Sequence, residues 1–322
     1  MSMLLEVRNL SVAFGAVTRP VQAVSGVDLA IAAGEIVGIA GESGSGKTTL
    51  CAALIRALPR AARVSGDIWF DGRSMHALSP RDLRRVRGRE IAMILQNPMT
   101  SLDPLFTIGN QLEEVLATRC DVPAARLRER AVELLRSVHM TAPEERLRQY
   151  PHELSGGMRQ RVLIAMASAT APRLLLADEP TTALAATIQE EILVLFREIR
   201  DRRGTAIAIV THDLGVIGRI CDRIVIMYAG RIVEEGPVAA VFAAPRHPYT
   251  RALLASVPVL DGDRVHLQSI AGQVPSLADL GDFCPFADRC PIVVDRCRAQ
   301  APPSTSFGDR QRVFCWRAEW VS

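Results

Sequence analysis

The sequence predicts an α/β fold with a helical subdomain inserted into it. Short apolar runs that have the character of buried strands alternate with segments of helical spacing, as in a sheet covered by helices. The clearest strands are expected at 36–40, 91–95, 174–177, 206–210 and 224–227. Between residues 109 and 170 the spacing is helical, which predicts the subdomain. After about residue 244 the chain becomes rich in Pro and Gly and loses its periodicity, so a domain boundary is expected there.

Composition excludes several classes of protein. The chain has 322 residues, 48% hydrophobic and 23% charged, as in an ordinary globular protein. The net charge of +3 is too small to indicate a nucleic-acid partner. The longest apolar stretch, 162–177, contains Pro172 and Arg173 and falls short of the ~20 residues of a membrane span. With no secretory signal at its start, the chain is expected to stay in the cytoplasm.

Two helices can be placed from local signals. A helix over 46–57 should follow the strand at 36–40. Thr187 stands three residues before Glu190, which is the spacing of a capping box. This spacing predicts a second helix over 187–199.

A glycine-rich loop lies between the first buried strand and the first helix. It fits the pattern G-x4-G-K-[ST] in the context that this motif requires. Glycines let backbone N–H groups point at phosphate oxygens, and the helix N-terminus adds positive charge. Lys47 is expected to reach the β- and γ-phosphates and Thr48 to bind Mg²⁺; the alternative is a turn that binds nothing. The predicted ATP-binding residues here are Gly41, Glu42, Ser43, Gly44, Ser45, Gly46, Lys47, Thr48 and Thr49.

Two carboxylates end the apolar strand at 174–177. Asp178 is expected to hold Mg²⁺, directly or through water. Glu179 is expected to act as the general base that orients and deprotonates the attacking water. A surface acidic pair is the alternative, but Pro180 and the apolar strand favour a site.

A third motif identifies the family that this chain resembles. Residues 154–161 read Leu-Ser-Gly-Gly-Met-Arg-Gln-Arg, after the glycine-rich loop and before the acidic strand end. Together the motifs resemble the nucleotide-binding subunits of ABC transporters over roughly residues 4–255. The resemblance implies a P-loop NTPase (RecA-like) core with an antiparallel β region and an inserted α-helical subdomain at about 97–172. The ATP-binding domain would span residues 1–243.

The resemblance also implies roles for single residues. Gln96 matches the glutamine that senses the γ-phosphate and would join Thr48 and Asp178 at Mg²⁺. His212 matches the switch histidine that contacts the γ-phosphate; with Glu179 and Gln96 it completes the expected catalytic set. Phe14 matches the aromatic residue that stacks on adenine, although a core position at a strand end is the alternative.

The signature run implies a pair of chains. In the family, the residues that match Ser155, Gly156 and Gly157 cap the ATP of the opposing chain, so two chains meet head to tail. One position departs from the family pattern. Ala185 stands where an aspartate usually orders the loop that faces the partner, which predicts slower hydrolysis at the partner's site with nucleotide binding retained.

Four of the seven cysteines are clustered near the C-terminus, whereas Cys51, Cys120 and Cys221 are scattered. Clustered cysteines in a cytosolic chain favour metal over disulfides. Four thiolates suit a [4Fe–4S] cluster with a structural role, and zinc or free thiols are the alternatives. The predicted ligands are Cys284, Cys290, Cys297 and Cys315.

Three segments resemble the oligopeptide/dipeptide importer branch of the family. They are 150–155, 245–250 and the Cys-Pro-Phe-Ala-Asp-Arg-Cys-Pro run at 284–291, and they imply an importer-type C-terminal extension over 244–322. Residues 255–283 are expected to be a plain linker or, alternatively, a regulatory surface.

The resemblance implies an ATP-hydrolysing motor at the cytoplasmic face of the inner membrane, importing di- or oligopeptides. The implied partners are a second ATPase subunit, forming a heterodimer, two transmembrane permease subunits and an extracytoplasmic solute-binding protein, with no nucleic acid. Nickel complexes, glutathione or another small solute are alternative cargoes. A low-turnover nucleotide-gated regulatory subunit is a further alternative. A DNA-repair or translation ATPase is disfavoured, because only about 100 residues separate the motifs and one module is present.

Overall fold

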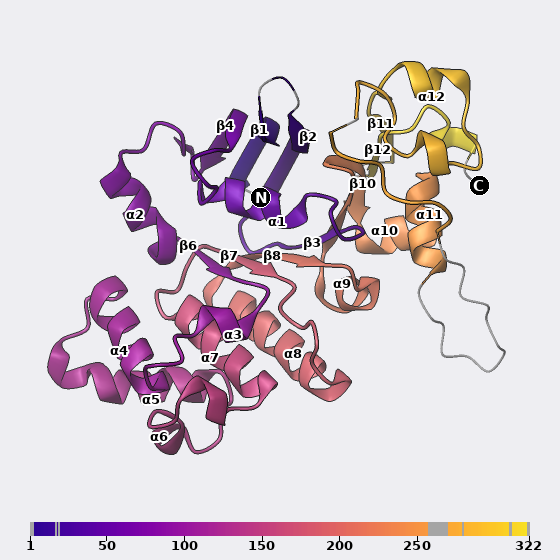
Figure 1. Ribbon diagram of the computed structural model, residues 1–322. Helices are drawn as coiled ribbons and strands as arrows, with labels where there is room; N and C mark the ends of the chain where they lie inside the picture. Colours follow the sequence, from indigo (N-terminus) through magenta and orange to yellow (C-terminus); the bar gives the residue numbers. More distant parts are fainter. Residues whose placement is uncertain are drawn as a thin grey trace, which may run out of the picture. The chain divides into compact units, whose positions relative to one another are not determined.

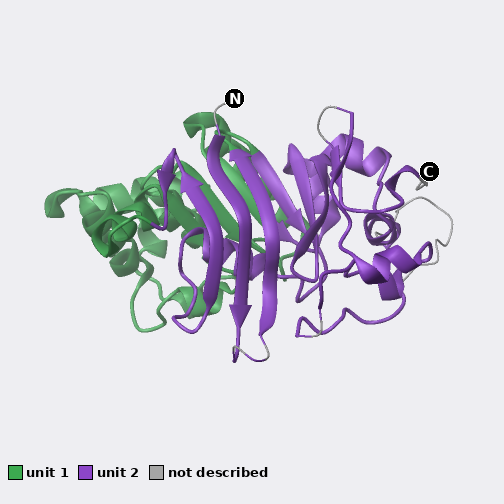
Figure 2. Ribbon diagram, turned by 90° about the horizontal axis from the view of Figure 1, so that it is seen from above, with its two compact units in different colours: residues 1–2, 32–35, 77–209 green, residues 3–31, 36–76, 210–322 purple. Residues whose placement is uncertain are grey.

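The computed structural model describes residues 3–16, 18, 20–256, 270–278, 280–308 and 311–320. These residues form two compact units, which Figure 2 draws in different colours. Unit 1 contains residues 32–35 and 77–209, and unit 2 contains the described residues of 3–31, 36–76 and 210–322. No described helix is long and apolar enough to cross a membrane.

The strands of unit 1 are short, apolar and buried. They are β6 (Ile91–Ile94), β7 (Leu174–Asp178) and β8 (Ala206–Thr211), whose last two residues belong to unit 2, in the order β8-β7-β6. β6 and β7 run parallel, with Ile91 opposite Leu174. Every residue of β7 and β8 is buried. Continuous apolar runs are what a strand covered on both faces requires, and they explain why these strands could be located from the sequence.

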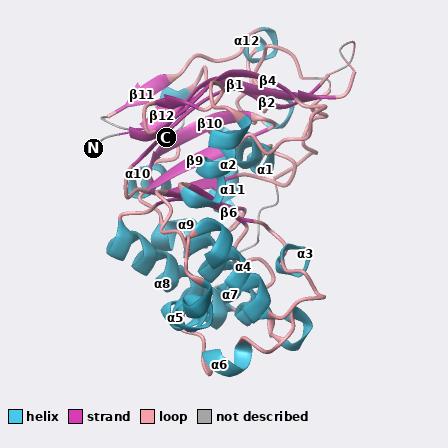
Figure 3. Cartoon of the chain, turned by 90° about the vertical axis from the view of Figure 1, so that its left-hand side faces the viewer, coloured by secondary structure: helices cyan, strands magenta, loops and turns pink. Residues whose placement is uncertain are grey.

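Helices make up most of the rest of unit 1, as the spacing between residues 109 and 170 predicts. They are α2 (Pro80–Arg89), α3 (Pro98–Ser101), α4 (Ile108–Arg119), η1 (Ala124–Arg126), α5 (Leu127–Ser137), α6 (Pro143–Arg146), η2 (Pro151–Glu153), α7 (Gly156–Ser168) and α8 (Ala186–Arg203). Figures 1 and 3 show α4 to α7 gathered in one group. Leu112 and Leu116, four residues apart on α4, are fully buried, as helical periodicity requires.

The predicted start of α8 is wrong. The helix begins at Ala186, so Thr187 lies in its first turn and cannot be the N-cap. Ala185 occupies the N-cap position with extended dihedral angles (φ −62°, ψ 148°) and supplies no side-chain hydrogen bond. The helix ends at Arg203, and Gly204 takes the left-handed conformation (φ 65°) that commonly terminates helices.

Unit 2 contains the antiparallel region that the family resemblance implies. Its four-stranded sheet has the order β2-β1-β4-β5, from β1 (Met3–Phe14), β2 (Val21–Ala32), β4 (Arg63–Phe70) and β5 (Arg73–Ser74). β1 and β4 are antiparallel, with Leu5 opposite Phe70 and Val12 opposite Val64. The register shifts between Arg8 and Ser11, so a bulge interrupts the ladder.

The remaining strands of unit 2 have the order β11-β12-β10-β9-β3. β3 (Ile36–Ala40) runs parallel to β9 (Arg223–Tyr228), and β10 (Arg231–Pro237) is antiparallel to β9. β12 (Gln311–Val313) and β11 (Thr305–Phe307) extend the same sheet beyond β10. The helices are α1 (Lys47–Leu54), α9 (Leu214–Ile220), α10 (Val238–Ala243), α11 (Pro248–Ala255), η3 (Ala287–Arg289), α12 (Asp295–Ala299) and η4 (Ala318–Trp320).

The C-terminal segment is therefore more regular than its sequence predicts. Its elements are only a few residues long, so no periodicity marks them, and pairing with β10 holds β12 in place. Residues 257–269 and 279, which fall in the predicted linker at 255–283, lie outside the described residues. The described parts of that segment beyond residue 256 contain no helix or strand.

A buried histidine anchors the start of α11. His247 is 1% exposed, and its Nδ1 accepts a hydrogen bond from the backbone N–H of Tyr249 at 3.1 Å. Its own backbone N–H donates to Glu234 Oε2 at 2.9 Å. Burial lowers the pKa of His247 to about 3, so the folded protein holds this ring neutral.

We expect His247 to make the protein less stable in acid. Between its ordinary pKa of about 6.5 and its folded pKa of about 3, the unfolded chain binds a proton that folded His247 does not. The free energy of unfolding therefore falls as the pH is lowered through this range. Asparagine offers a side-chain oxygen in place of Nδ1 as the cap acceptor but does not titrate, so His247→Asn should reduce the loss of melting temperature between about pH 7 and pH 5.

The exposed His76 provides the control. His76→Asn should retain the full pH dependence. An unchanged pH dependence in His247→Asn would contradict the assignment of acid sensitivity to this ring.

Candidate nucleotide-binding site

The glycine-rich loop connects the end of β3 to the start of α1, both in unit 2. Lys47, at the first position of α1, folds back over the loop. Its Nζ donates to Gly41 O at 2.7 Å, to Glu42 O at 2.9 Å and to Ser45 Oγ at 3.2 Å. The side chain is 6% exposed. The ammonium group is therefore held by two backbone carbonyl oxygens and one hydroxyl oxygen. An incoming phosphate would replace these acceptors.

Two of the loop glycines are required by close backbone contacts. At Gly41 (φ 151°) a Cβ atom would lie 2.1 Å from Met227 O. At Gly46 (φ 96°) it would lie 2.3 Å from Ala23 O. Any side chain at either position would push the loop away from the strands that support it. The loop shape thus depends on β2, on β9 and on glycine at both ends.

Unit 1 carries the acidic part of the predicted site. β7 ends at Asp178, which is buried, and Glu179 follows with a left-handed backbone (φ 48°). Glu179 Oε2 accepts from Thr182 Oγ1 at 2.8 Å and from Gln96 Nε2 at 3.1 Å. The structure therefore brings together Gln96 and Glu179, which are 83 residues apart in sequence. Strained backbone at a carboxylate with two directing hydrogen bonds is a common feature of functional sites.

His212 lies on the turn that connects β8 to α9 in unit 2, and its side chain is exposed. The turn is well defined, because Thr211 Oγ1 accepts from Asp213 N at 3.0 Å and Asp213 caps α9. Phe14 ends β1 and is partly exposed, so both the stacking role and the core role remain open to it.

The signature run forms a helix start in unit 1. Ser155 is exposed and caps α7, with its Oγ accepting from Met158 N at 3.3 Å. At Gly157 a Cβ atom would lie 2.5 Å from Ile188 Cγ2 on α8, so glycine permits the two helices to approach. The run thus presents the N-terminus of a 13-residue helix at an exposed position.

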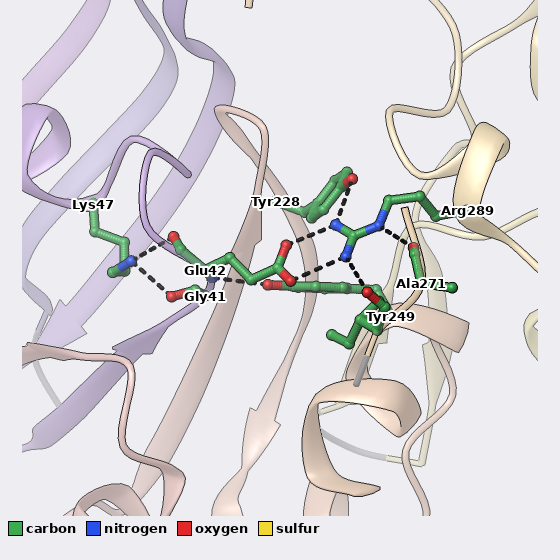
Figure 4. A network of polar contacts seen from close by, with 8 residues as sticks. Gly41, Glu42, Lys47, Tyr228, Tyr249, Ala271 and Arg289 are labelled. Carbon is green, nitrogen blue, oxygen red and sulfur yellow. Dashed lines mark hydrogen bonds and ion pairs between the residues drawn. The ribbon is translucent and has the colours of Figure 1, made fainter. Parts of the chain in front are cut away.

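Sequence reasoning missed the residues that surround Glu42. Its carboxylate pairs with Arg289, and its backbone N–H donates to Tyr249 Oη at 2.9 Å (Figure 4). Neither partner belongs to a motif of the predicted ATP site. Arg289 is 247 residues from Glu42 in sequence, so no local spacing signals the pair.

Of the four clustered cysteines, Cys284 and Cys297 are buried, and Cys290 and Cys315 are half-buried. Burial, together with the three other clustered thiols, raises the pKa of Cys284 to about 12. Burial likewise raises the pKa of Cys315 to about 11 and raises that of Cys290. Among the described residues, however, no three His, Cys, Asp or Glu side chains are arranged to hold a single metal ion. The predicted cysteine ligands therefore lie near one another, but the described residues do not show the arrangement that one metal ion would need.

Ala185 leaves the N-terminus of α8 without a side-chain cap, and an aspartate or asparagine there would supply one. We expect Ala185→Asp and Ala185→Asn each to raise the free energy of unfolding by about 1 kcal/mol. Urea unfolding monitored by circular dichroism measures this change. Ala186→Asp, one residue inside the helix, should give a smaller gain. No gain in either residue-185 variant would contradict the cap geometry.

Comparison with known proteins assigns two regions of the chain. The family described as "ABC transporter" matches residues 24–182, and that described as "Oligopeptide/dipeptide transporter, C-terminal region" matches residues 233–297. A probable peptide ABC transporter ATP-binding protein of Sinorhizobium fredii is 47% identical, over 99% of this chain and 96% of its own length. The dipeptide transport ATP-binding protein DppD of Escherichia coli is 42% identical, over 97% and 96%.

A solved structure shares the fold. The ATP-binding cassette MJ0796, determined as a dimer in a post-hydrolysis state with ADP and Pi, is 30% identical with a TM-score of 0.65 and covers 73% of this chain and 98% of its own. The chain belongs to the ABC transporter ATP-binding proteins, in the branch that carries the oligopeptide/dipeptide transporter C-terminal region.

Proposed function

We propose that the chain is the ATP-hydrolysing motor subunit of an importer for di- or oligopeptides. The observation that carries the proposal is the Glu179 carboxylate, which two hydrogen bonds orient at the end of a buried strand. A chain that only sensed nucleotide would not need a directed base. The named relatives transport peptides or dipeptides, which supports peptides as the cargo.

Each proposed role follows from the chemistry of the side chain. Lys47 binds the phosphates, and Glu179 positions and deprotonates the attacking water. His212 contacts the γ-phosphate, and Phe14 stacks on adenine. Thr48, Asp178 and Gln96 offer the oxygen donors that Mg²⁺ prefers, and the ion would neutralise phosphate charge when bound. The ATP-binding domain and the C-terminal extension are proposed to span residues 1–243 and 244–322.

The exposed start of α7 supports a head-to-tail pair of ATPase chains. Ser155, Gly156 and Gly157 would offer N–H groups and a hydroxyl to the γ-phosphate on the opposing chain. The MJ0796 cassette is a dimer, which agrees with this arrangement. We propose a second, similar chain as the partner, forming a heterodimer.

An exposed apolar surface next to Gln96 is proposed to bind the permease subunits. Its members are Leu95, Met99, Leu105 and Phe106, which are 52%, 53%, 79% and 54% exposed. Four exposed large apolar side chains within twelve residues of sequence suit a protein interface. Two transmembrane permease subunits would hold the chain at the cytoplasmic face of the membrane, and an extracytoplasmic solute-binding protein would deliver the peptide.

The proposed function predicts peptide-dependent ATP turnover by the complete complex in lipid. Adding a solute-binding protein loaded with a tripeptide should raise the turnover. Glu179→Gln should lower that turnover by roughly 100-fold or more, because the general base is lost, while ATP binding is kept. Glu129→Gln, on an exposed surface ion pair, is the control and should behave as the parent.

Turnover that responds to loaded nickel complexes or glutathione but not to peptides would overturn the peptide assignment. Turnover that persists in Glu179→Gln would overturn the role of the base.

We also propose that the four clustered cysteines hold a [4Fe–4S] cluster. The supporting observation is that these thiols lie close enough to influence one another's pKa, and a bound metal would have to displace their protons. Anaerobically purified protein should contain about four irons per chain, and Cys297→Ser should lose them. Cys120→Ser, outside the cluster, should keep them. About one zinc per chain would identify the rival metal, and the absence of both metals would contradict the proposal.

A further inference from the structure

Glu42 connects the phosphate loop to the C-terminal extension through a two-point ion pair. Arg289 Nη1 donates to Glu42 Oε2 at 2.7 Å, and Nη2 donates to Oε1 at 3.1 Å (Figure 4). The Arg289 side chain is 5% exposed and that of Glu42 is 26% exposed. Paired N–H groups that face both oxygens of one carboxylate form one of the strongest and most directional side-chain contacts.

The Arg289 guanidinium has a partner for every donor. Besides Glu42, Nη1 donates to Tyr228 Oη at 3.1 Å and Nη2 to Ile270 O at 3.1 Å, while Nε donates to Ala271 O at 2.9 Å. These contacts use all five N–H groups that a guanidinium carries. The group also lies over the Tyr228 ring, 5.7 Å from its centroid. Arg289 therefore holds Glu42 from a fixed position.

The segment that carries Arg289 is anchored in the core of unit 2. Phe286, three residues earlier, is 1% exposed, and its ring centroid lies 5.3 Å from that of Tyr228 and 5.4 Å from that of Tyr249. Tyr249 also accepts from the Glu42 backbone N–H at 2.9 Å. Two side chains of the extension, Tyr249 and Arg289, thus contact Glu42, and Tyr228 of β9 supports Arg289.

The backbone of Glu42 contacts the lysine that is predicted to bind phosphate. Its carbonyl oxygen accepts from Lys47 Nζ at 2.9 Å, so the residue that Arg289 fixes also fixes the predicted phosphate-binding lysine. Without Arg289, the Glu42 carboxylate would lose its counter-charge. Its negative charge would then repel the phosphates that the loop is proposed to bind. Both effects, the lost anchor and the added repulsion, would weaken the binding of ATP.

We propose that Arg289 is a positioning residue of the phosphate loop, through which the C-terminal extension sets the affinity for ATP. The proposal rests on the proposed nucleotide role of Lys47 and its loop. It gives the extension, whose sequence lies far from the ATP-site motifs, a direct effect on the nucleotide site.

A double-mutant cycle on the full chain tests this inference. The dissociation constant of Mg·ATP is measured by calorimetry for the parent, Arg289→Ala, Glu42→Gln and the double variant. Arg289→Ala should weaken ATP binding by about tenfold in the parent background. In the Glu42→Gln background, the same substitution should weaken it by less than about twofold, because no carboxylate is left to hold or neutralise. Equal losses in both backgrounds would show that Arg289 acts only by packing and would overturn the proposal.

Two further variants support the cycle. Arg298→Ala removes an exposed ion pair with Asp288 in the same extension and should leave ATP affinity unchanged. If Arg289→Ala does not fold, Arg289→Lys replaces it in the cycle, since lysine keeps a charge but cannot form the paired contact. It should show a smaller loss that likewise disappears with Glu42→Gln.

Lys47→Ala separates this inference from the proposed function. ATP affinity that is lost in Lys47→Ala but kept in folded Arg289→Ala overturns the role of Arg289 alone. ATP affinity that Lys47→Ala does not change overturns the assignment of the loop and, with it, this inference. Neither readout depends on the transported solute.

Discussion

The close approach of the glycine-rich loop to its supporting strands is the constraint on which the nucleotide site depends. Gly41 lies against Met227 O and Gly46 against Ala23 O, at distances that admit no Cβ atom. Lys47 lies back over this loop, where three acceptors hold its ammonium group. Once the loop is fixed in this way, the Glu42 side chain is directed away from Lys47 and towards the extension, where Arg289 receives it (Figure 4).

The two units contribute different chemistry to the proposed reaction. In the proposed function, Lys47 and the loop N–H groups of unit 2 would bind phosphate, and Asp178 and Glu179 of unit 1 would serve metal and water. In unit 1 the strained backbone at Glu179 and its two hydrogen bonds point the carboxylate, so the base is oriented before any substrate binds. The uncapped start of α8 at Ala185 follows shortly afterwards in the chain.

The parts of the fold that could be predicted are those with a continuous local signal. β3 has the predicted bounds 36–40 because all five residues are buried, and the helical spacing of Leu112 and Leu116 marks α4. β4 and β12 escaped prediction for physical reasons. β4 buries only Ile68 and Phe70 of its eight residues, and β12 is a three-residue strand held by pairing with β10. Likewise, motifs located the phosphate loop, whereas the Arg289 contact depends on folding alone.

In the proposed function, ATP hydrolysis at this site drives peptide uptake. The most direct test is the accumulation of a labelled tripeptide inside proteoliposomes that carry the complete complex, with ATP enclosed in the lumen and the peptide and its binding protein supplied outside. We expect the tripeptide to accumulate above its external concentration, and this accumulation should be lost when ATP is replaced by a non-hydrolysable analogue. Accumulation that is indifferent to ATP, or the absence of uptake by a complex that hydrolyses ATP in response to the peptide-loaded binding protein, would contradict it.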